Sequence, residues 1–162
     1  MSYGRFAAMI LASTVIMYGL MYLNTYELGH VFFSETRAWM ALYMGAMMAI
    51  IMLAFMLGMY KKTKVNIAIF VGAAVVFAGS LFLVRSQNTI ADEAWMSAMI
   101  PHHSIAIMTS ERASLKDPRV RELAQAIIVA QRREIAEMKY LIDDIEQNGP
   151  RTEERLPEEM QP

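Results

Sequence analysis

The chain has 162 residues, no cysteine and a formal net charge of -1, so disulfide bridges, thiolate metal sites and cysteine nucleophiles are excluded. Hydrophobic residues make up 56% of the sequence and the mean hydropathy is +0.29, which is more apolar than a typical soluble domain and indicates a membrane protein. No basic block is interleaved with aromatic residues, so nucleic acid is not an expected partner. Without cysteine, methionine and histidine are the remaining soft or borderline metal ligands.

Three apolar runs without an interior charge come first, at residues 6–23, 38–60 and 65–84. At a rise of about 1.5 Å per residue, each is long enough to cross a hydrocarbon core about 30 Å thick. We therefore predict three transmembrane helices within residues 1–85, with the lipid bilayer as their surroundings. Arg5 precedes the first run, as in a signal peptide, but no small-residue cleavage pattern follows it, and an uncleaved anchor is expected.

The charges in the two links between these runs predict the orientation of the chain. Lys61, Lys62 and Lys64 fill the second link, whereas the first link contains Glu27, Glu35 and a single arginine. Positively charged links remain in the cytoplasm, so the N-terminus and the lysine-rich link are expected there. Three spans then place the rest of the chain in the periplasm or outside the cell.

A helical hairpin followed by a charged tail is predicted beyond the apolar runs. The hairpin covers residues 86–148, and the tail, residues 149–162, is rich in charge and proline and is expected to be disordered. Thr89, followed three residues later by Asp92, is typical of a helix start, and helical periodicity continues to about Leu115.

A second helix start follows a short link, because Asp117 is a capping residue and Pro118 suits the first helical position. The periodicity continues to about Asn148, where Gly149 and Pro150 end the helix. The short link makes the two helices antiparallel neighbours. Two helices bury too little surface to be stable alone, so we expect an all-α homo-oligomer that completes a bundle of four or more helices.

Each helix of the hairpin carries a stripe at helical spacing, and polar residues interrupt the two stripes at the same level. The first stripe comprises Met96, Met99, His103, Ala106, Ser110 and Ala113, and the second comprises Val120, Leu123, Ala124, Ile127, Gln131, Ile135, Met138, Leu141, Ile142 and Ile145. If the link is a tight turn near residues 116 and 117, His103 faces Gln131. Met99 then lies opposite Glu134 or Ile135, and Met96 opposite Met138. His102 points about 100° away from His103, toward a flank of the hairpin.

This level of the hairpin predicts a metal site, because imidazole and thioether together select copper, and Cu(I) in particular, where thiols are absent. The candidate ligands are His102, His103, Met96, Met99, Met138, Glu134, Gln131 and Met108. The alternative is a structural module without metal, in which the histidines hydrogen-bond to Gln131 or Glu134 and fix the register of the oligomer. A copper-dependent oxidase is a third possibility, and no catalytic residue is predicted.

Three further features are interpreted without a metal. The methionines of the second apolar run are expected to fill space in the membrane, although a Cu(I) path is the alternative. His30, in the first link, is expected to be a solvated loop residue, although an auxiliary metal ligand is the alternative. Pro101 lies inside the first hairpin helix, where it removes a backbone hydrogen bond and is expected to bend the axis.

Two linked motifs resemble the family called domain of unknown function 305 (DUF305), over about residues 92–145. They read MSAMIPHHSIAIMTSERA and DPRVRELAQAIIVAQRREIAEMKYLIDDI. The family pattern is Met-x-x-Met-Ile-x-His-His, then Ala-Ile, then Gln-x-x-Glu-Ile-x-x-Met on the next helix. The positions that match the pattern are Met96, Met99, His102, His103, Gln131, Glu134 and Met138. Many members have an acidic residue and then Met after the histidines, whereas this chain has Met108 and Thr109.

The resemblance implies a ferritin-like helical domain in the bacterial envelope, with copper binding and copper tolerance in some members. It identifies the hairpin as half of a ferritin-like four-helix bundle in a membrane-anchored form of the family. We therefore expect a multi-pass protein of the bacterial inner (plasma) membrane that acts in copper handling as a buffer, chaperone or sensor. Other copper-handling proteins of the envelope are expected partners.

Overall fold

The computed structural model describes residues 2–151, which form five α-helices, two short 3-10 helices and no strand. The chain divides into two compact units. Among the described residues, the first consists of 2–23 together with Ser34–Ile90, and the second of Asn24–Phe33 together with 91–151. The predicted all-α fold class is confirmed, whereas the ferritin-like half-bundle stays a prediction. From residue 152 on, the predicted tail lies outside the described residues.

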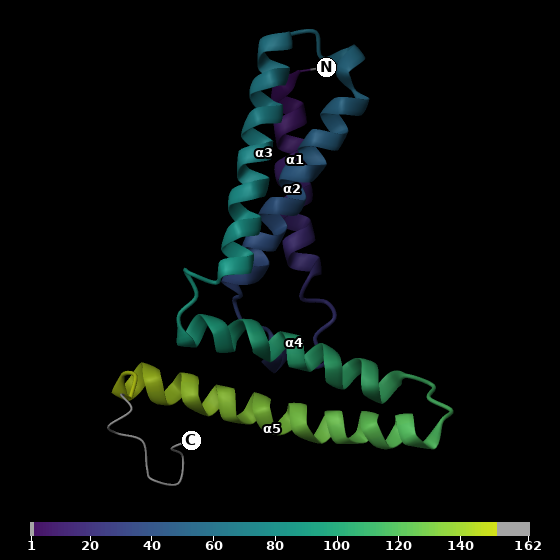
Figure 1. Ribbon diagram of the computed structural model, residues 1–162, viewed down its shortest axis with the longest axis vertical. Helices are drawn as coiled ribbons and strands as arrows, with labels where there is room; N and C mark the ends of the chain where they lie inside the picture. Colours follow the sequence, from purple (N-terminus) through teal and green to yellow (C-terminus); the bar gives the residue numbers. More distant parts are fainter. Residues whose placement is uncertain (1, 152–162) are drawn as a thin grey trace. The chain divides into compact units, whose positions relative to one another are not determined.

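The first unit contains three long helices, α1 (Tyr3–Leu20), α2 (Glu35–Phe55) and α3 (Thr63–Ser86) (Figure 1). α2 packs against both α1 and α3. Each of the three is long and apolar enough to cross a membrane, as predicted. A 3-10 turn, η2 (Leu57–Met59), follows α2, so this helix ends before the apolar run at residues 38–60 does.

Serine side chains fix where α1 and α2 begin. Ser2 Oγ accepts a hydrogen bond from the Arg5 N–H at 3.2 Å, and Ser34 Oγ accepts one from the Arg37 N–H at 3.2 Å. Each bond satisfies one of the amides that the first turn of a helix leaves without a partner. The helices therefore begin ahead of the apolar runs, because capping sets their first residue and hydropathy does not.

Close packing of α1 on α2 depends on Gly45. A Cβ added at Gly45 would overlap the side chain of Thr14 on α1, and small residues of this kind let membrane helices approach closely. Gly45→Ala is therefore expected to destabilise the first unit by about 1–3 kcal/mol, measured as thermal unfolding in detergent. Gly72→Ala on α3 is the control, since a Cβ there meets nothing within 4 Å, and it should leave stability unchanged or slightly higher. Equal effects of the two substitutions would contradict this packing.

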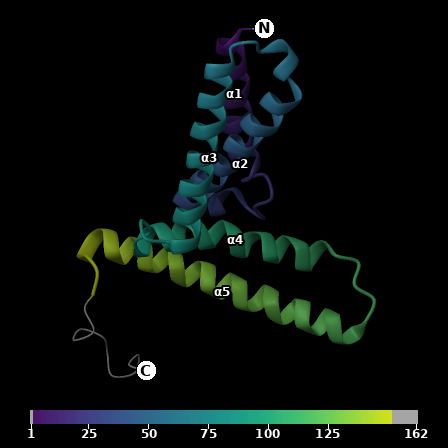
Figure 2. The same ribbon diagram turned by 45° about the horizontal axis from the view of Figure 1, so that its top comes forward.

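The second unit consists of a helical hairpin and a short 3-10 turn. α4 (Asp92–Arg112) and α5 (Pro118–Asn148) are antiparallel neighbours in both views (Figures 1 and 2), and the turn, η1 (Leu28–His30), contacts α4. The predicted Thr89 cap of α4 is wrong, because Ala91 holds the N-cap position and makes no side-chain capping bond. Asp92 instead lies in the first turn, where the helix dipole favours a carboxylate.

The predicted start and end of α5 are confirmed. Asp117 Oδ1 accepts a hydrogen bond from the Arg119 N–H at 2.9 Å, and Pro118 is the first helical residue. Gly149, with φ of 75°, ends the helix after Asn148. Only glycine adopts such a positive φ without strain, which is why the helix ends at this position.

The core of the second unit differs from the predicted seam on α4. Its buried cluster comprises Met96, Ile100, Ile107, Ile128, Ile135, Met138 and Ile142. α4 is thus rotated from the predicted stripe, so that Ile100 and Ile107 are buried and Ala106 is not. The isoleucines bury more apolar area than alanine or serine at neighbouring positions, and this rotation is therefore more stable. On α5, Val120, Leu123 and Leu141 were predicted in the seam but are exposed.

Candidate functional site

His103 and Glu134 lie next to each other on facing helices. His103 Nδ1 is 3.1 Å from Glu134 Oε2, and the Gln131 side-chain amide donates to the same oxygen at 3.1 Å. The three polar side chains predicted at one level of the hairpin are thus together. The predicted pairing of His103 with Gln131 is wrong in detail, because the carboxylate of Glu134 lies between these two side chains.

The link between the helices explains this difference in register. α4 already ends at Arg112, short of the predicted Leu115, and the backbone is extended at Ala113 and Asp117, with ψ of 134° and 127°. An extended link advances along the hairpin instead of turning tightly, so α5 begins beyond the end of α4 (Figures 1 and 2). Facing residues are therefore displaced by about one helical turn from the prediction.

The imidazole of His103 is mostly buried and its Nδ1 has no hydrogen-bond partner among residues 2–151, despite the short distance to Glu134. Burial lowers the pKa of His103 from its ordinary value of 6.5, and His102 lowers this pKa further, while the Glu134 carboxylate raises it. The net shift favours the neutral ring. A neutral imidazole is the form that binds a metal ion, so the environment of His103 suits a ligand.

The methionines predicted as ligands differ in their surroundings. Met96 and Met138, predicted to face each other, belong to the same buried cluster, and Met99 packs against it. Met108 is partly buried but lies five positions after His103, about 140° around the helix axis. The structure therefore groups three of the four methionines in or against the core of the hairpin, and Met108 is not among them.

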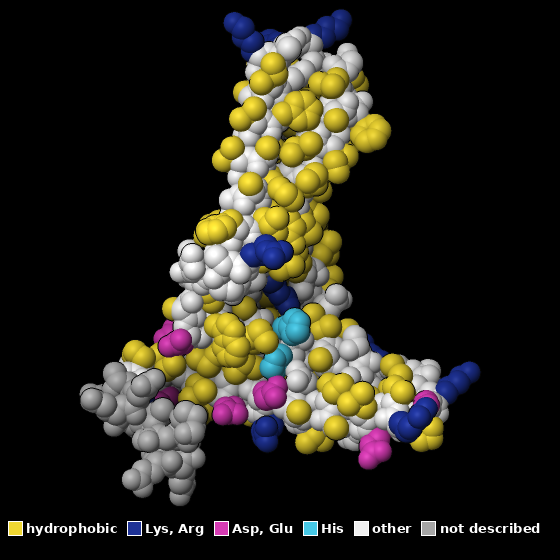
Figure 3. Space-filling model, in the orientation of Figure 1, with side chains coloured by type: hydrophobic (Ala, Val, Ile, Leu, Met, Phe, Trp, Pro, Cys, Tyr) yellow, Lys and Arg dark blue, Asp and Glu magenta, His cyan; other side chains and the backbone are white. Residues whose placement is uncertain are grey.

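His102 lies on the surface of α4, as predicted. Its ring centroid is 6.1 Å from that of His103, and the residue is exposed. Histidine and acidic side chains lie close together among hydrophobic ones on this face of the second unit (Figure 3). Within residues 2–151, no group of three or more histidine, aspartate or glutamate side chains is arranged to hold a metal ion.

The loop Asn24–Phe33 is part of the site region, which the sequence did not predict. The Tyr26 N–H donates to Ser104 Oγ at 2.7 Å, and His30 Nδ1 shares a hydrogen bond with the same oxygen at 3.0 Å. Ser104 is 0% exposed and His30 is 8% exposed. The expectation that His30 is solvated is therefore wrong, since its ring is buried between the loop and α4.

The surroundings of His30 predict a pH-dependent loop. Burial lowers its pKa below 6.5, nearby Lys139 lowers it further, and Glu27 opposes the shift, while Arg132 lines the same hollow. The unfolded chain then binds a proton more readily than the folded one. Stability is full above pH 6.5 and is lost as the pH falls from there toward the lowered pKa.

Amide exchange of residues 24–33 measures this effect as a protection factor, that is, relative to the intrinsic exchange rate at each pH, and the protection should decrease between pH 7.5 and 5.5. His30→Gln keeps a hydrogen-bond acceptor but does not titrate. It should therefore reduce the slope of loop protection against pH. Part of the slope should remain in this variant, because the pKa of His103 is shifted in the same direction. An unchanged slope in His30→Gln would contradict the role given to His30.

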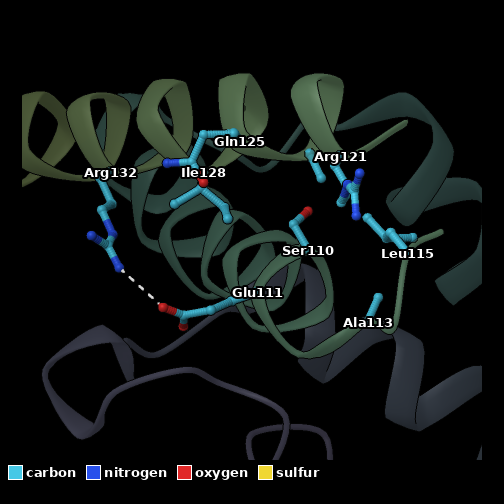
Figure 4. Close-up of a pocket in the computed structure, with 9 residues that line it drawn as sticks. Ser110, Glu111, Ala113, Leu115, Arg121, Gln125, Ile128 and Arg132 are labelled. Carbon is cyan, nitrogen blue, oxygen red and sulfur yellow. Dashed lines mark ion pairs between the residues drawn. The ribbon is translucent and has the colours of Figure 1, made fainter. Parts of the chain in front are cut away.

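A hollow of about 320 Å³ lies between the C-terminal half of α4 and the N-terminal half of α5 (Figure 4). Glu111 and Arg132 form an ion pair of 3.7 Å at one end, and Arg121 and Leu115 lie at the other. A hydrogen bond to Glu111 also raises the pKa of Tyr26 from the loop. None of the predicted ligands lines this hollow.

Comparison with known proteins places this hairpin in a family. A stretch of 85 residues is 39% identical to an uncharacterized protein of Acanthamoeba polyphaga mimivirus and covers 51% of this chain and 53% of that protein. The chain thus spans about half the length of this curated relative. No solved structure matches the chain significantly. Residues 82–149 match the model of the family described as domain of unknown function (DUF305), so this segment belongs to that family, as its motifs predicted.

Proposed function

We propose that the chain is a membrane-anchored copper-binding protein that handles copper in the bacterial envelope as a buffer, chaperone or sensor. The metal would be held on the α4–α5 hairpin by His103 and Glu134, with thioether ligands from Met96, Met99 and Met138. His102, Gln131 and Met108 are the remaining candidates. Gln131 would orient Glu134. Met108 is the least supported candidate, because it lies about 140° around the α4 axis from His103.

The observation that carries this proposal is the buried Nδ1 of His103. A buried polar atom without a hydrogen bond is costly, so it is uncommon unless another partner satisfies it. Glu134 Oε2 lies 3.1 Å away, which is close enough for both atoms to contact one ion. A cation between them would satisfy the nitrogen and the carboxylate together.

The donor set favours copper over zinc. Structural zinc sites use four nitrogen, oxygen or thiolate ligands, and the described residues provide no cluster of three histidine or carboxylate side chains. The remaining donors of the predicted set are the thioethers of the hairpin methionines, which bind soft Cu(I) in preference to zinc. Cu(I) is therefore the metal that these residues fit best.

The proposed location follows from the charges of the links and from the second unit. The lysines at 61, 62 and 64 favour a cytoplasmic second link and a cytoplasmic N-terminus. The first link packs with the hairpin in one unit, as expected if three spans bring both to the same side of the membrane. This supports a multi-pass protein of the inner (plasma) membrane with a periplasmic hairpin, where copper-handling proteins of the envelope would be its partners.

A second copy of the chain is the proposed partner for the open flank of the hairpin. The loop covers the flank of α4 that carries Ser104, while Leu123 on α5 remains 60% exposed. Val120 and Leu141 on α5 are exposed as well, and covering such apolar side chains favours association. A second hairpin would also supply ligands that one copy lacks, as the prediction of a homo-oligomer requires.

The second candidate function is a structural module without metal. The hydrogen bond from Gln131 to Glu134 favours this module, because it already gives the Glu134 carboxylate a partner without a metal. In that case the polar side chains would fix the register of an oligomer. Oligomerisation would then be independent of copper and sensitive to His103→Ala.

Titration of the full chain in detergent distinguishes the two functions. Cu(I), Cu(II) and Zn(II) are each added in competition with a chelator, and the oligomeric state is measured on the same samples. The copper proposal predicts saturable Cu(I) binding that is tighter than Zn(II) binding. Absence of saturable Cu(I) binding, with an oligomer that forms regardless of metal, would favour the structural module.

A further inference from the structure

Three atoms join the first link of the chain to α4. They are the Tyr26 N–H, Ser104 Oγ and His30 Nδ1, and we call this arrangement the clasp. Its two hydrogen bonds are 2.7 and 3.0 Å long, and its serine is fully buried. Tyr26 and Phe32 on either side also pack against the core of the hairpin, so the loop is held over most of its length.

We propose that the clasp couples metal binding on the hairpin to the link between α1 and α2, with Ser104 as the positioning residue. This rests on the proposed copper function. It extends that function from metal binding to a response within the chain. The link would be held more tightly in the metal-bound protein and released more readily in the metal-free one.

The loop contacts both helices directly beside proposed ligands. Ser104 directly follows His103 on α4. Because the clasp fixes Ser104, it also affects how far the helix can rotate at His103. Lys139 follows Met138 on α5, and its Nζ lies 6.0 Å from the centre of the Phe32 ring. Because each contact is one residue from a proposed ligand, a change of ligand position would alter the loop contacts on both helices.

Pro101 makes this part of α4 dependent on the loop. Proline has no N–H, so the helix lacks the backbone bond that would join residue 101 to Ser97. The helix continues through this position, and Ser104 in the next turn is held from outside by Tyr26 and His30. The clasp thus holds α4 from outside in the turn that follows the missing backbone bond.

The loop is covalently connected to α1 at one end and to α2 at the other. α1 ends at Leu20 and α2 begins at Glu35, and the loop Asn24–Phe33 lies between them in sequence. A change in how the loop is held therefore acts on the ends of both helices through a few residues of backbone. Coupling of this kind is reciprocal, so the clasp must strengthen metal binding by the same factor as metal strengthens the clasp.

The test combines Cu(I) affinity with amide exchange of the loop, both measured on the full chain in detergent. Ser104→Ala removes the clasp oxygen and should weaken Cu(I) binding about 10-fold, which is the lower end of the loss on removing a group that orients a metal ligand. In the unmodified chain, Cu(I) should slow exchange of the Tyr26 N–H. In Ser104→Ala, this slowing should disappear.

His30→Leu is the second variant, because it removes one of the two clasp bonds from the loop side and keeps the bond from the Tyr26 N–H to Ser104 Oγ. It should show both effects of Ser104→Ala in the same direction but to a smaller extent. Thr109→Ala is the matched control, since the Thr109 hydroxyl donates within α4 to the carbonyl oxygens of Ile105 and Ala106. This control should change neither the affinity nor the exchange of Tyr26.

The outcomes separate the coupling from the copper function. Normal Cu(I) affinity in both clasp variants, or a Tyr26 exchange rate that copper does not change, would overturn the coupling and leave the copper site standing. No Cu(I) binding by the unmodified chain would end both the copper function and the coupling. In that case Ser104→Ala without metal should still speed up exchange of Tyr26, because the clasp itself would remain.

Discussion

His103→Ala is expected to weaken Cu(I) binding by at least about 100-fold, beyond the loss usual for residues that only orient a ligand. The substitution removes the nitrogen whose buried Nδ1 faces Glu134 at 3.1 Å. It also leaves the Glu134 carboxylate with the side-chain amide of Gln131, which supplies no imidazole nitrogen. Competition titration with a chromophoric chelator, on the full chain in detergent, measures the change in affinity.

Two controls accompany this substitution. His102→Ala removes an exposed imidazole from the neighbouring position and should cost less affinity than His103→Ala, since that side chain does not face Glu134. Thr109→Ala should leave the affinity unchanged. If His103→Ala binds Cu(I) as tightly as the unmodified chain while its oligomer dissociates, the structural module would replace the copper site as the better account.

Ile100→Ala is expected to destabilise the hairpin by about 2–5 kcal/mol, the range found for large-to-small substitutions in protein cores. Ile100 is 0% exposed and belongs to the cluster shared by α4 and α5. Removing three of its carbon atoms loses apolar burial and leaves a cavity that the two helices cannot fill completely. Urea denaturation of the full chain in detergent, followed by hydrogen exchange within α4 and α5, measures the loss.

Val129→Ala on α5 is the control for this substitution. Its side chain is 61% exposed, so the change in stability should stay within about 0.5 kcal/mol. The pair also tests the rotation of α4, because Ile100 lies outside the stripe predicted from the sequence. Similar small effects at both positions would mean that the predicted stripe, and not the buried isoleucines, faces α5.

Local signals were sufficient to predict α5 and the three long apolar helices. Asp117, Pro118 and Gly149 act through the hydrogen bonds and dihedral angles of their own neighbourhood, and the helix begins and ends where they predict. Length and apolar composition likewise identify α1, α2 and α3 as helices able to cross a membrane. Such features depend on a few consecutive residues, so a single sequence contains them.

The register of the hairpin could not be predicted in the same way. It depends on the path of the link from Ala113 to Asp117. The backbone is extended at both residues, and no local sequence motif predicts this. The rotation of α4 depends on which residues bury more area against α5, and this is a property of both helices together. The coincidence of His103, Gln131 and Glu134 at one level was predicted, but the order of their contacts was not.

The clasp was missed for a related reason. Tyr26 and Ser104 are separated by 78 positions, and neither residue stands out in its own segment. The one signal available was His30, a histidine in a link, which was interpreted as a solvated residue. Its burial became evident only when the loop and α4 were placed in the same unit.

X-ray absorption spectroscopy of the Cu(I)-loaded full chain identifies the atoms bound to copper. We expect a mixed shell with at least one imidazole nitrogen and one thioether sulfur, and loss of the imidazole contribution in His103→Ala. Copper surrounded by oxygen or nitrogen alone, or a spectrum that His103→Ala leaves unchanged, would contradict a copper site built from His103 and the methionines of the hairpin.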